Sequence, residues 1–167
     1  SLPMVTDIKK SPRLQILDSG LLNYFLGIQK DIIGTDDLNS IYQGTLIEHL
    51  IGQELLAFQY NALSALNFWV REKKESTAEV DYLFQYDGLI IPIEVKSGKE
   101  GTLKSLHSYM DIAPHNFAIR FYAGTLNITD AITQNGKQYK ILNLPYYLGS
   151  QIEKYIDWFI QTKKVDP

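Results

Sequence analysis

The sequence of 167 residues contains no cysteine and has no excess of basic residues. Without cysteine there can be no disulfides, thiolate zinc sites, iron–sulfur clusters or cysteine nucleophiles. Sixteen basic against nineteen acidic residues give a formal net charge of −3, which excludes a polybasic protein that binds nucleic acid through bulk charge. Any metal bound by this chain is therefore expected to have oxygen ligands.

Long hydrophobic runs and a secretory signal are also missing. The longest apolar stretches are interrupted by Glu48, Glu54 or Glu94 and stay below the ~18 residues that a membrane-spanning helix needs. The first four residues, Ser1-Leu2-Pro3-Met4, lack the basic and apolar regions of a signal peptide. The composition, 45% hydrophobic and 21% charged, is typical of a globular domain. We therefore expect a soluble, cytoplasmic protein with no membrane partner.

Neither common phosphate-binding motif of nucleotide-binding proteins is present. The chain has no GxxxxGK[ST] loop and no GxGxxG turn. We therefore expect no nucleotide site within this chain. The histidines have no metal-ligand spacing such as HExxH, so no zinc site is expected either.

Hydrophobic periodicity predicts an α/β fold with a mixed central sheet flanked by helices. Asp18-Ser19 offers an N-cap for a helix over Leu21–Leu26 that ends at Gly27. Apolar residues then recur at spacings of three and four, which predicts a long helix over residues 41–58. Further helices are expected at 102–110 and 151–160, and strands at 66–70, 80–86, 89–95, 117–122 and 139–144.

We expect three parts along the chain. Residues 1–40 form an N-terminal helical segment, residues 41–148 form the core, and residues 149–167 form a C-terminal helix. The sequence shows no internal repeat and no long linker.

A predicted β-hairpin around Asp87-Gly88 is the most informative stretch. Asp-Gly between two apolar runs is typical of a two-residue type I′ turn. Such a turn places Tyr86 opposite Leu89 and fixes the register of both strands. One face of the hairpin is then apolar and is expected to face the core; it carries Val80, Tyr82, Phe84, Tyr86, Leu89, Ile91, Ile93 and Val95.

The other face gathers four charged residues, with Asp81 opposite Glu94 and Glu79 opposite Lys96. Like charges placed directly opposite each other are destabilising, so the two carboxylates need a shared proton, a basic partner or a divalent cation. Carboxylates on a rigid hairpin suit Mg²⁺ or Mn²⁺. Two alternatives stay open: the charges line a solvated sheet face neutralised by Lys96, or Pro92 marks a bulge that shifts the register.

The sequence Asp81…Glu94-Val95-Lys96 resembles the core signature of the PD-(D/E)xK nuclease superfamily. The resemblance implies that Asp81 and Glu94, with the carbonyl of Val95, hold one or two divalent ions. It also implies that Lys96 positions or activates the attacking water.

Glu48 is expected to complete the catalytic set of Asp81, Glu94 and Lys96, and four further residues receive supporting or phosphate-binding roles; each of these five has a simpler alternative. The superfamily pattern has a glutamate on a preceding helix, and Glu48 is the first choice for it and Glu54 the second. The alternative for Glu48 is an exposed helix residue. The alternative for Glu54 is a buried residue with a partner. Glu79 either tunes Lys96 or forms a surface ion pair of little energy. Lys99 and Lys104 either contact phosphate or belong to an ordinary solvated helix start.

Several blocks in order resemble the C-terminal domain of unknown function of prokaryotic AAA-type ATPases, over roughly residues 10–148. The resemblance implies a restriction-endonuclease-like fold, a preceding phosphate-loop ATPase module in the same polypeptide, and a chain that is the C-terminal part of a longer protein. The blocks are Lys10-Ser11-Pro12-Arg13-Leu14, Leu17-Asp18-Ser19-Gly20-Leu21-Leu22, residues 44–55, Ala78-Glu79-Val80-Asp81, residues 91–98 and Ile141-Leu142-Asn143-Leu144-Pro145.

We therefore expect a nuclease-like domain that hydrolyses phosphodiesters of nucleic acid with Mg²⁺ or Mn²⁺. The alternative is a non-catalytic module of the same fold that docks DNA, a partner protein or its own ATPase; the lack of a strongly basic groove favours it. A third interpretation is an interaction domain that sets an oligomeric state through the helix at 151–160.

Overall fold

The computed structural model describes residues 4, 7, 11–33, 44–58, 65–73, 76–98 and 102–164. Its centre is a six-stranded mixed sheet with the strand order β1-β2-β3-β4-β6-β5. Neighbouring strands are antiparallel except for the pairs β3–β4 and β4–β6, which are parallel. The strands are β1 (Asn67–Lys73), β2 (Ser76–Tyr86), β3 (Leu89–Val95), β4 (Phe117–Tyr122), β5 (Asn127–Ile132) and β6 (Gln138–Pro145).

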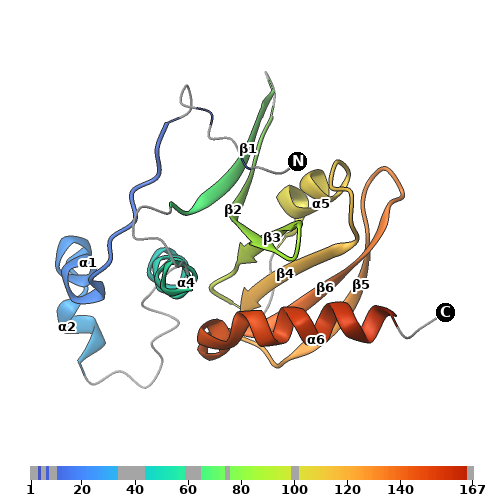
Figure 1. Ribbon diagram of the computed structural model, residues 1–167. Coiled ribbons are helices and arrows are strands. Elements are labelled where there is room, and N and C mark those ends of the chain that lie inside the picture. The colour runs from blue at the N-terminus through green and yellow to red at the C-terminus, as the bar shows by residue number, and fades with distance from the viewer. Residues whose placement is uncertain are drawn as a thin grey trace.

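Helices flank this sheet on both faces, with α5 on one side and α4 and α6 on the other (Figure 1). The predicted α/β class with a mixed sheet between helices is therefore confirmed. The division into 1–40, 41–148 and 149–167 stays a prediction. The helices are α1 (Ser19–Leu26), α2 (Gln29–Ile32), α4 (Thr45–Ala57), α5 (Lys104–Met110) and α6 (Ile152–Lys164), with a 3-10 helix η1 (Tyr146–Gln151) before α6. None of the helices in the described part of the chain is long and apolar enough to cross a membrane.

Local sequence signals account for the ends of α1. The Asp18 side chain accepts a hydrogen bond from the Leu21 amide at 2.8 Å, as an N-cap does. Gly27 ends the helix with φ of 69°, a left-handed conformation that glycine adopts without steric cost. The predicted start of the next helix at residues 41–43 lies outside the described residues, and α4 begins at Thr45.

The hairpin turn forms as predicted. Asp87 and Gly88 both have positive φ, 44° and 77°, which is the type I′ arrangement. The β2–β3 ladder runs from Tyr86–Leu89 to Tyr82–Ile93, so the predicted register is confirmed over this stretch. Pro92 pairs with Leu83 inside this regular ladder and marks no bulge.

An irregularity lies instead on the opposite edge of β2, where it pairs with β1. Asn67 pairs with Leu83 but Trp69 pairs with Val80, so β2 has one more residue than β1 in this interval. Such a bulge reverses the side-chain alternation of the strand. The expectation that Val80 shares a face with Tyr82 is therefore wrong, because the two residues belong to different hydrophobic clusters.

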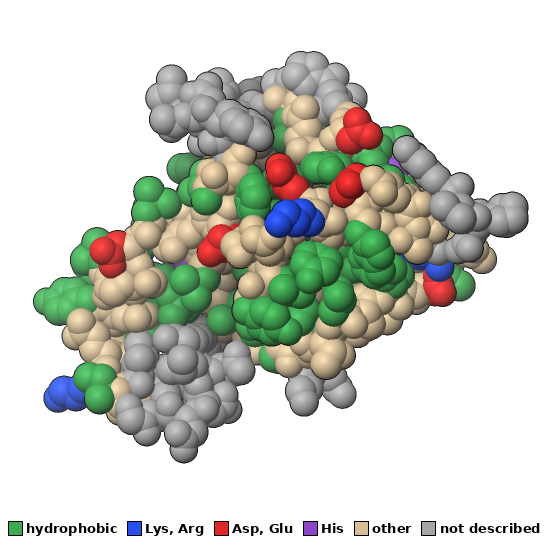
Figure 2. All heavy atoms as spheres, turned by 60° about the horizontal axis from the view of Figure 1, so that its bottom comes forward, with side chains coloured by type: hydrophobic (Ala, Val, Ile, Leu, Met, Phe, Trp, Pro, Cys, Tyr) green, Lys and Arg blue, Asp and Glu red, His purple; other side chains and the backbone are tan. Residues whose placement is uncertain are grey.

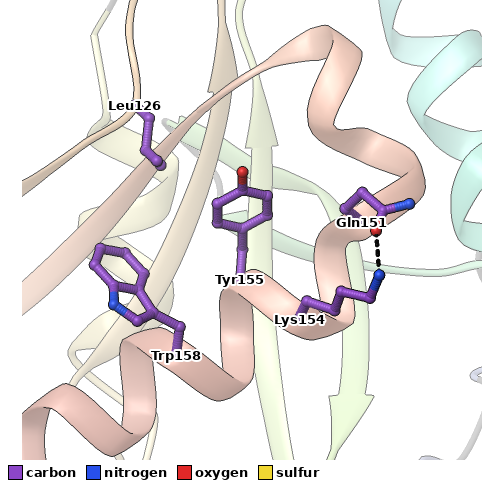
Figure 3. Close-up of a pocket in the computed structure, with 5 residues that line it drawn as sticks. All are labelled: Leu126, Gln151, Lys154, Tyr155 and Trp158. Atoms are coloured by element: carbon purple, nitrogen blue, oxygen red, sulfur yellow. Dashed lines mark hydrogen bonds between the residues drawn. The ribbon is translucent and has the colours of Figure 1, made fainter.

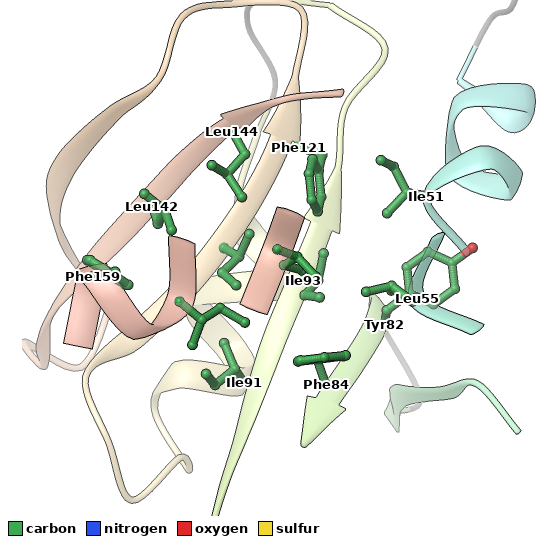
Figure 4. Packing of buried hydrophobic residues seen from close by; sticks show 13 residues of the cluster. Ile51, Leu55, Tyr82, Phe84, Ile91, Ile93, Phe121, Leu142, Leu144 and Phe159 are labelled. Atoms are coloured by element: carbon green, nitrogen blue, oxygen red, sulfur yellow. The ribbon is translucent and has the colours of Figure 1, made fainter. Parts of the chain in front are cut away.

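The sheet is buried on both faces. The larger cluster, here called the α6-side core, joins α4 and α6 to the sheet (Figure 4). The smaller α5-side core packs α5 on the other face. The predicted polar face of the hairpin is thus not an open sheet face. The α6-side core contains Ile51, Leu55, Tyr82, Phe84, Ile91, Ile93, Ile119, Phe121, Leu142, Leu144, Ile152, Ile156 and Phe159, and the α5-side core Val80, Leu106, Tyr109, Met110, Ala113, Ala118, Tyr139 and Ile141.

Candidate carboxylate site

Asp81 lies where the β2–β3 ladder ends. Its Oδ2 accepts a hydrogen bond of 2.7 Å from the Val95 amide, so the side chain replaces a backbone carbonyl as the partner of β3. The pKa of Asp81 is raised to about 6, because burial and the charge of Glu48 outweigh the lowering effect of the Val95 hydrogen bond. Asp81 is therefore fixed beside the end of β3.

Glu94 is the most buried of the predicted site residues, with 4% of its surface exposed. Lys96 Nζ donates to Glu94 Oε1 at 2.5 Å, whereas Oε2 is buried without a hydrogen-bond partner. Burial, followed by the charge of Asp81, raises the pKa of Glu94 to about 7. Asp81, Glu94 and Lys96 thus come together as predicted, and they leave one buried carboxylate oxygen free.

The predicted pairing of Glu79 with Lys96 is wrong. At Glu79 the strand β2 pairs with Val70 of β1, while the Lys96 amide donates to the Phe121 carbonyl of β4 at 2.9 Å. The β2–β3 ladder ends at Tyr82–Ile93, so Glu79 lies in a part of β2 that pairs only with β1, while the end of β3 pairs with β4. Lys96 therefore neutralises Glu94, and Glu79 finds another cation.

That cation is Arg13, for which the sequence alone predicts no role. Its Nη2 lies 2.5 Å from Glu48 Oε1, and its Nε lies 3.2 Å from Glu79 Oε1. Its Nη1 donates to the Asp81 carbonyl at 2.9 Å, and the guanidinium lies 5.2 Å from the Phe68 ring centroid. The only sequence signal was the position of Arg13 in a block shared with the resembled family.

The two helix glutamates have different surroundings. Glu48 of α4 forms an ion pair with Arg13, which also contacts Glu79. Burial raises the pKa of Glu48. The charge of Arg13 lowers this pKa, and the charges of Glu79 and Glu94 raise it. Glu54 lies two turns along the same helix, where its side chain packs against Gly149 of η1. The first choice for the helix glutamate is therefore placed at the site.

The predicted phosphate contacts are less well placed. Lys99 lies outside the described residues. Lys104 is exposed at the first residue of α5, and within the described part of the chain it forms no ion pair with the site carboxylates.

A small cavity of about 30 Å³ lies beside these groups, with Arg13, Glu48, Asp81 and Tyr82 among its lining residues. This volume is close to the share of one water molecule in the liquid, about 30 Å³. A larger pocket of about 370 Å³ lies on α6 and is lined by Leu126, Gln151, Lys154, Tyr155 and Trp158 (Figure 3). It contains no predicted site residue, so size alone does not locate the chemistry here.

The carboxylate pair fits a hard divalent cation. Mg²⁺ commonly takes one or two carboxylates and completes its shell with water and substrate phosphate. Asp81 and Glu94 offer two carboxylates, and the free Oε2 of Glu94 is a buried oxygen that lacks a donor. Across the described residues, however, no three His, Asp or Glu side chains are grouped to hold a metal ion. Glu48 is held by Arg13 and is not a third ligand in this arrangement.

The fold and site define a mixed α/β protein with a buried carboxylate–lysine cluster at the end of a hairpin. The chain belongs to the family described as domain of unknown function DUF4143, whose sequence profile matches residues 43–147. The matched region contains Glu48, Asp81, Glu94 and Lys96 but begins after Arg13. No curated protein and no solved structure matches the chain with significant similarity.

Proposed function

We propose that this chain is a nuclease-like domain that hydrolyses phosphodiester bonds of nucleic acid with Mg²⁺ or Mn²⁺. The observation that carries the proposal is the buried Glu94 carboxylate beside the half-buried Asp81: one Glu94 oxygen has no donor and Lys96 donates to the other. A folded protein rarely buries a carboxylate next to a second one without a compensating ligand. The restriction-endonuclease-like arrangement implied by the sequence resemblance is part of this proposal.

The roles of the residues follow from their contacts. Asp81 and Glu94, with the Val95 carbonyl, would hold the ion, which when bound polarises a phosphate and lowers the pKa of a bound water. Lys96 Nζ has three N–H donors, of which one is used on Glu94 Oε1. The others are available to orient the attacking water or to stabilise negative charge on the phosphate. Glu48 acts through Arg13 or through a water in the small cavity.

A calorimetric titration with Mn²⁺ tests the site directly. The wild-type chain is expected to bind the ion, and Asp81→Ala and Glu94→Ala are expected to abolish binding. Glu54→Ala is the matched control, because it removes a carboxylate from α4 away from the pair. Absence of binding to the wild type, or normal binding to both site variants, would contradict the proposal.

Nuclease assays then separate a metal site from a catalytic one. Single-stranded, double-stranded and branched DNA are incubated with Mn²⁺ and either the wild type or Lys96→Ala. We expect cleavage that requires Lys96. Metal binding without cleavage of any of these substrates would leave the ion with a structural role.

The second candidate is a docking module that binds DNA, a partner protein or an ATPase module without catalysis. Figure 2 favours it, because basic side chains are few and scattered on the face that it shows, whereas hydrophobic ones gather near its centre. The DUF4143 domain is known as a C-terminal domain in AAA-type ATPases, so an ATPase module of the same polypeptide is the partner we propose for this alternative. DNA binding by both the wild type and Lys96→Ala, with no cleavage by either protein, would support it.

A further inference from the structure

A row of polar residues crosses four neighbouring strands next to the carboxylate pair. Glu94 of β3 pairs with Arg120 of β4, Arg120 pairs with Asn143 of β6, and Asn143 pairs with Asn127 of β5. Paired residues of adjacent strands lie about 4.7–4.9 Å apart and point to the same face. We call these four residues the polar row.

The polar row lies on the face of the sheet that α5 covers. Ala118 and Ile141, two residues before Arg120 and Asn143, belong to the α5-side core, whereas the intervening Ile119 and Leu142 belong to the other core. The alternation of a strand therefore directs the row to the α5 side. At these positions the sheet face carries polar side chains instead of the apolar ones of the α5-side core, and one of them, Asn143, is fully buried.

Three atoms of this row are buried and have no hydrogen-bond partner. They are Glu94 Oε2, Arg120 Nε and Asn143 Oδ1, two acceptors and one donor. Buried polar groups in folded proteins are nearly always hydrogen-bonded, so a cluster of exceptions needs a reason. A bound group that accepts a hydrogen bond from Arg120 would satisfy one of these three atoms.

Arg120 packs against an aromatic ring. Its guanidinium carbon lies 4.5 Å from the Tyr122 ring centroid. The Tyr122 hydroxyl is fixed in turn, because it donates to the Thr125 carbonyl at 2.6 Å and accepts from Asn127 Nδ2 at 2.8 Å. Within the described part of the chain, Arg120 forms no ion pair and donates no hydrogen bond. The result is a preoriented cation whose donors are free.

We propose that Arg120 binds a non-bridging phosphate oxygen of a nucleic-acid strand next to the Asp81–Glu94 pair. This inference rests on the proposed function, since it names the group that holds its substrate. The planar fork of arginine matches two phosphate oxygens, and arginine is less strongly hydrated than lysine. Lys96, which follows β3 and forms an ion pair with Glu94, and Arg120, which lies opposite Glu94 on β4, would then be the two cations next to the bound phosphate.

The test measures binding and needs no cleavage. The anisotropy of a short fluorescein-labelled single-stranded DNA is followed with the 167-residue chain, once with EDTA and once with Ca²⁺. Arg120→Gln is expected to weaken binding by about 10- to 100-fold, as the loss of a charge-assisted hydrogen bond does. It should also lower the salt dependence by about 0.7 in the slope of log K against log salt, the value for one phosphate contact on a single strand.

Arg71→Gln is the matched control. Arg71 also lies over an aromatic ring, that of Trp69 at 6.0 Å, but it sits on β1 and donates to Ser108. The substitution Arg71→Gln removes the same charge and the same kind of ring contact as Arg120→Gln. We expect it to change DNA binding by less than about twofold. Arg120→Lys keeps the charge without the fork, so it is expected to weaken binding with an unchanged salt slope, and it serves if Arg120→Gln fails to fold.

The inference is overturned if wild type binds no DNA in either buffer, if the Arg120 variants bind like wild type, or if Arg71→Gln loses as much. Displacement of the DNA by inorganic phosphate at equal ionic strength would identify a site for free phosphate and would overturn the assignment to nucleic acid. Binding that depends on Arg120, in a protein that cleaves nothing, would contradict the proposed hydrolysis but leave this inference standing.

Discussion

The pH dependence of stability is the most direct consequence of burying Glu94 beside Asp81. Burial and the neighbouring charge of Asp81 raise the pKa of Glu94 from 4.5 to about 7. The folded protein therefore holds this proton more tightly than the unfolded chain does. The stability that it contributes is fully present below the unfolded pKa and is lost as the pH rises through about 7.

The variant Glu94→Gln isolates this effect, because it keeps the shape of the side chain and an acceptor for Lys96 but cannot ionise. A tenfold change in proton affinity is worth about 1.4 kcal/mol, so a rise in pKa from 4.5 to about 7 corresponds to about 3 kcal/mol. We expect the free energy of unfolding of Glu94→Gln, relative to wild type, to increase by about that amount between pH 4.5 and pH 8. Lys96 keeps the amide oxygen as an acceptor, and its side chain, which is 27% exposed, is also in contact with solvent.

Urea unfolding followed by tryptophan fluorescence in EDTA, at several pH values, measures this difference. Burial lowers the pKa of His49 and of His115, which makes stability rise with pH near neutrality. Both histidines are present in wild type and variant, so their effect cancels in the difference. Asp157→Asn is the control, because it makes the same kind of change at an exposed position of α6; the same loss of pH dependence in this variant would show that the effect is not specific to Glu94.

Parallel stability curves for wild type and Glu94→Gln would refute the reasoning, as would a variant that is less stable than wild type at pH 8. Mn²⁺ adds an independent arm. At a free concentration about 100-fold above its dissociation constant, a ligand that binds only the folded state adds about 2.7 kcal/mol. We expect that gain for wild type at pH 8 and none for Glu94→Gln.

Three further substitutions test the fold around the site. Phe121→Ala truncates a fully buried ring of the α6-side core and should cost about 3–5 kcal/mol in urea unfolding; a loss below about 1 kcal/mol would contradict this packing. Gly88→Ala places alanine at φ of 77°, where the added Cβ has no atom within 4 Å, so backbone strain is the main cost. The melting temperature should fall by the equivalent of about 1–2 kcal/mol. An unchanged melting temperature would exclude the type I′ turn. Arg13→Gln leaves Glu48 without its cation and should cost about 1 kcal/mol, whereas Arg13→Lys should recover part of it; equal stability of all three proteins would show that the pair contributes nothing.

Local patterns predicted most of the secondary structure because each rests on interactions within a few residues. The Asp18 cap, the Gly27 end of α1 and the Asp87-Gly88 turn all appear in the structure. The strand β5 was not predicted. It is an edge strand with two exposed polar or small residues at its centre and another exposed residue at its end, so it lacks the hydrophobic signal on which a strand prediction depends.

The candidate site also has a part that the sequence predicts and a part that it does not. The hairpin register from Tyr86–Leu89 to Tyr82–Ile93 follows from the turn, because a type I′ loop fixes which residues face each other, and this brings Asp81 and Glu94 to the same end of the ladder. The partners of Glu79 and Glu48 do not follow, because Arg13 arrives from 35 residues before Glu48 and no local pattern encodes that contact.

The sequence by itself determined the α/β class, the hairpin and the identity of the charged residues at its end, since these depend on periodicity and turn chemistry. Only the tertiary structure decided which charges neutralise each other and which face each residue takes. The bulge opposite β1 moves Val80 to the other core, and the parallel pairing of β3, β4 and β6 aligns Glu94, Arg120 and Asn143. Such alignments join residues far apart in the chain, and their energies come from burial and cross-strand contact, which no short segment contains.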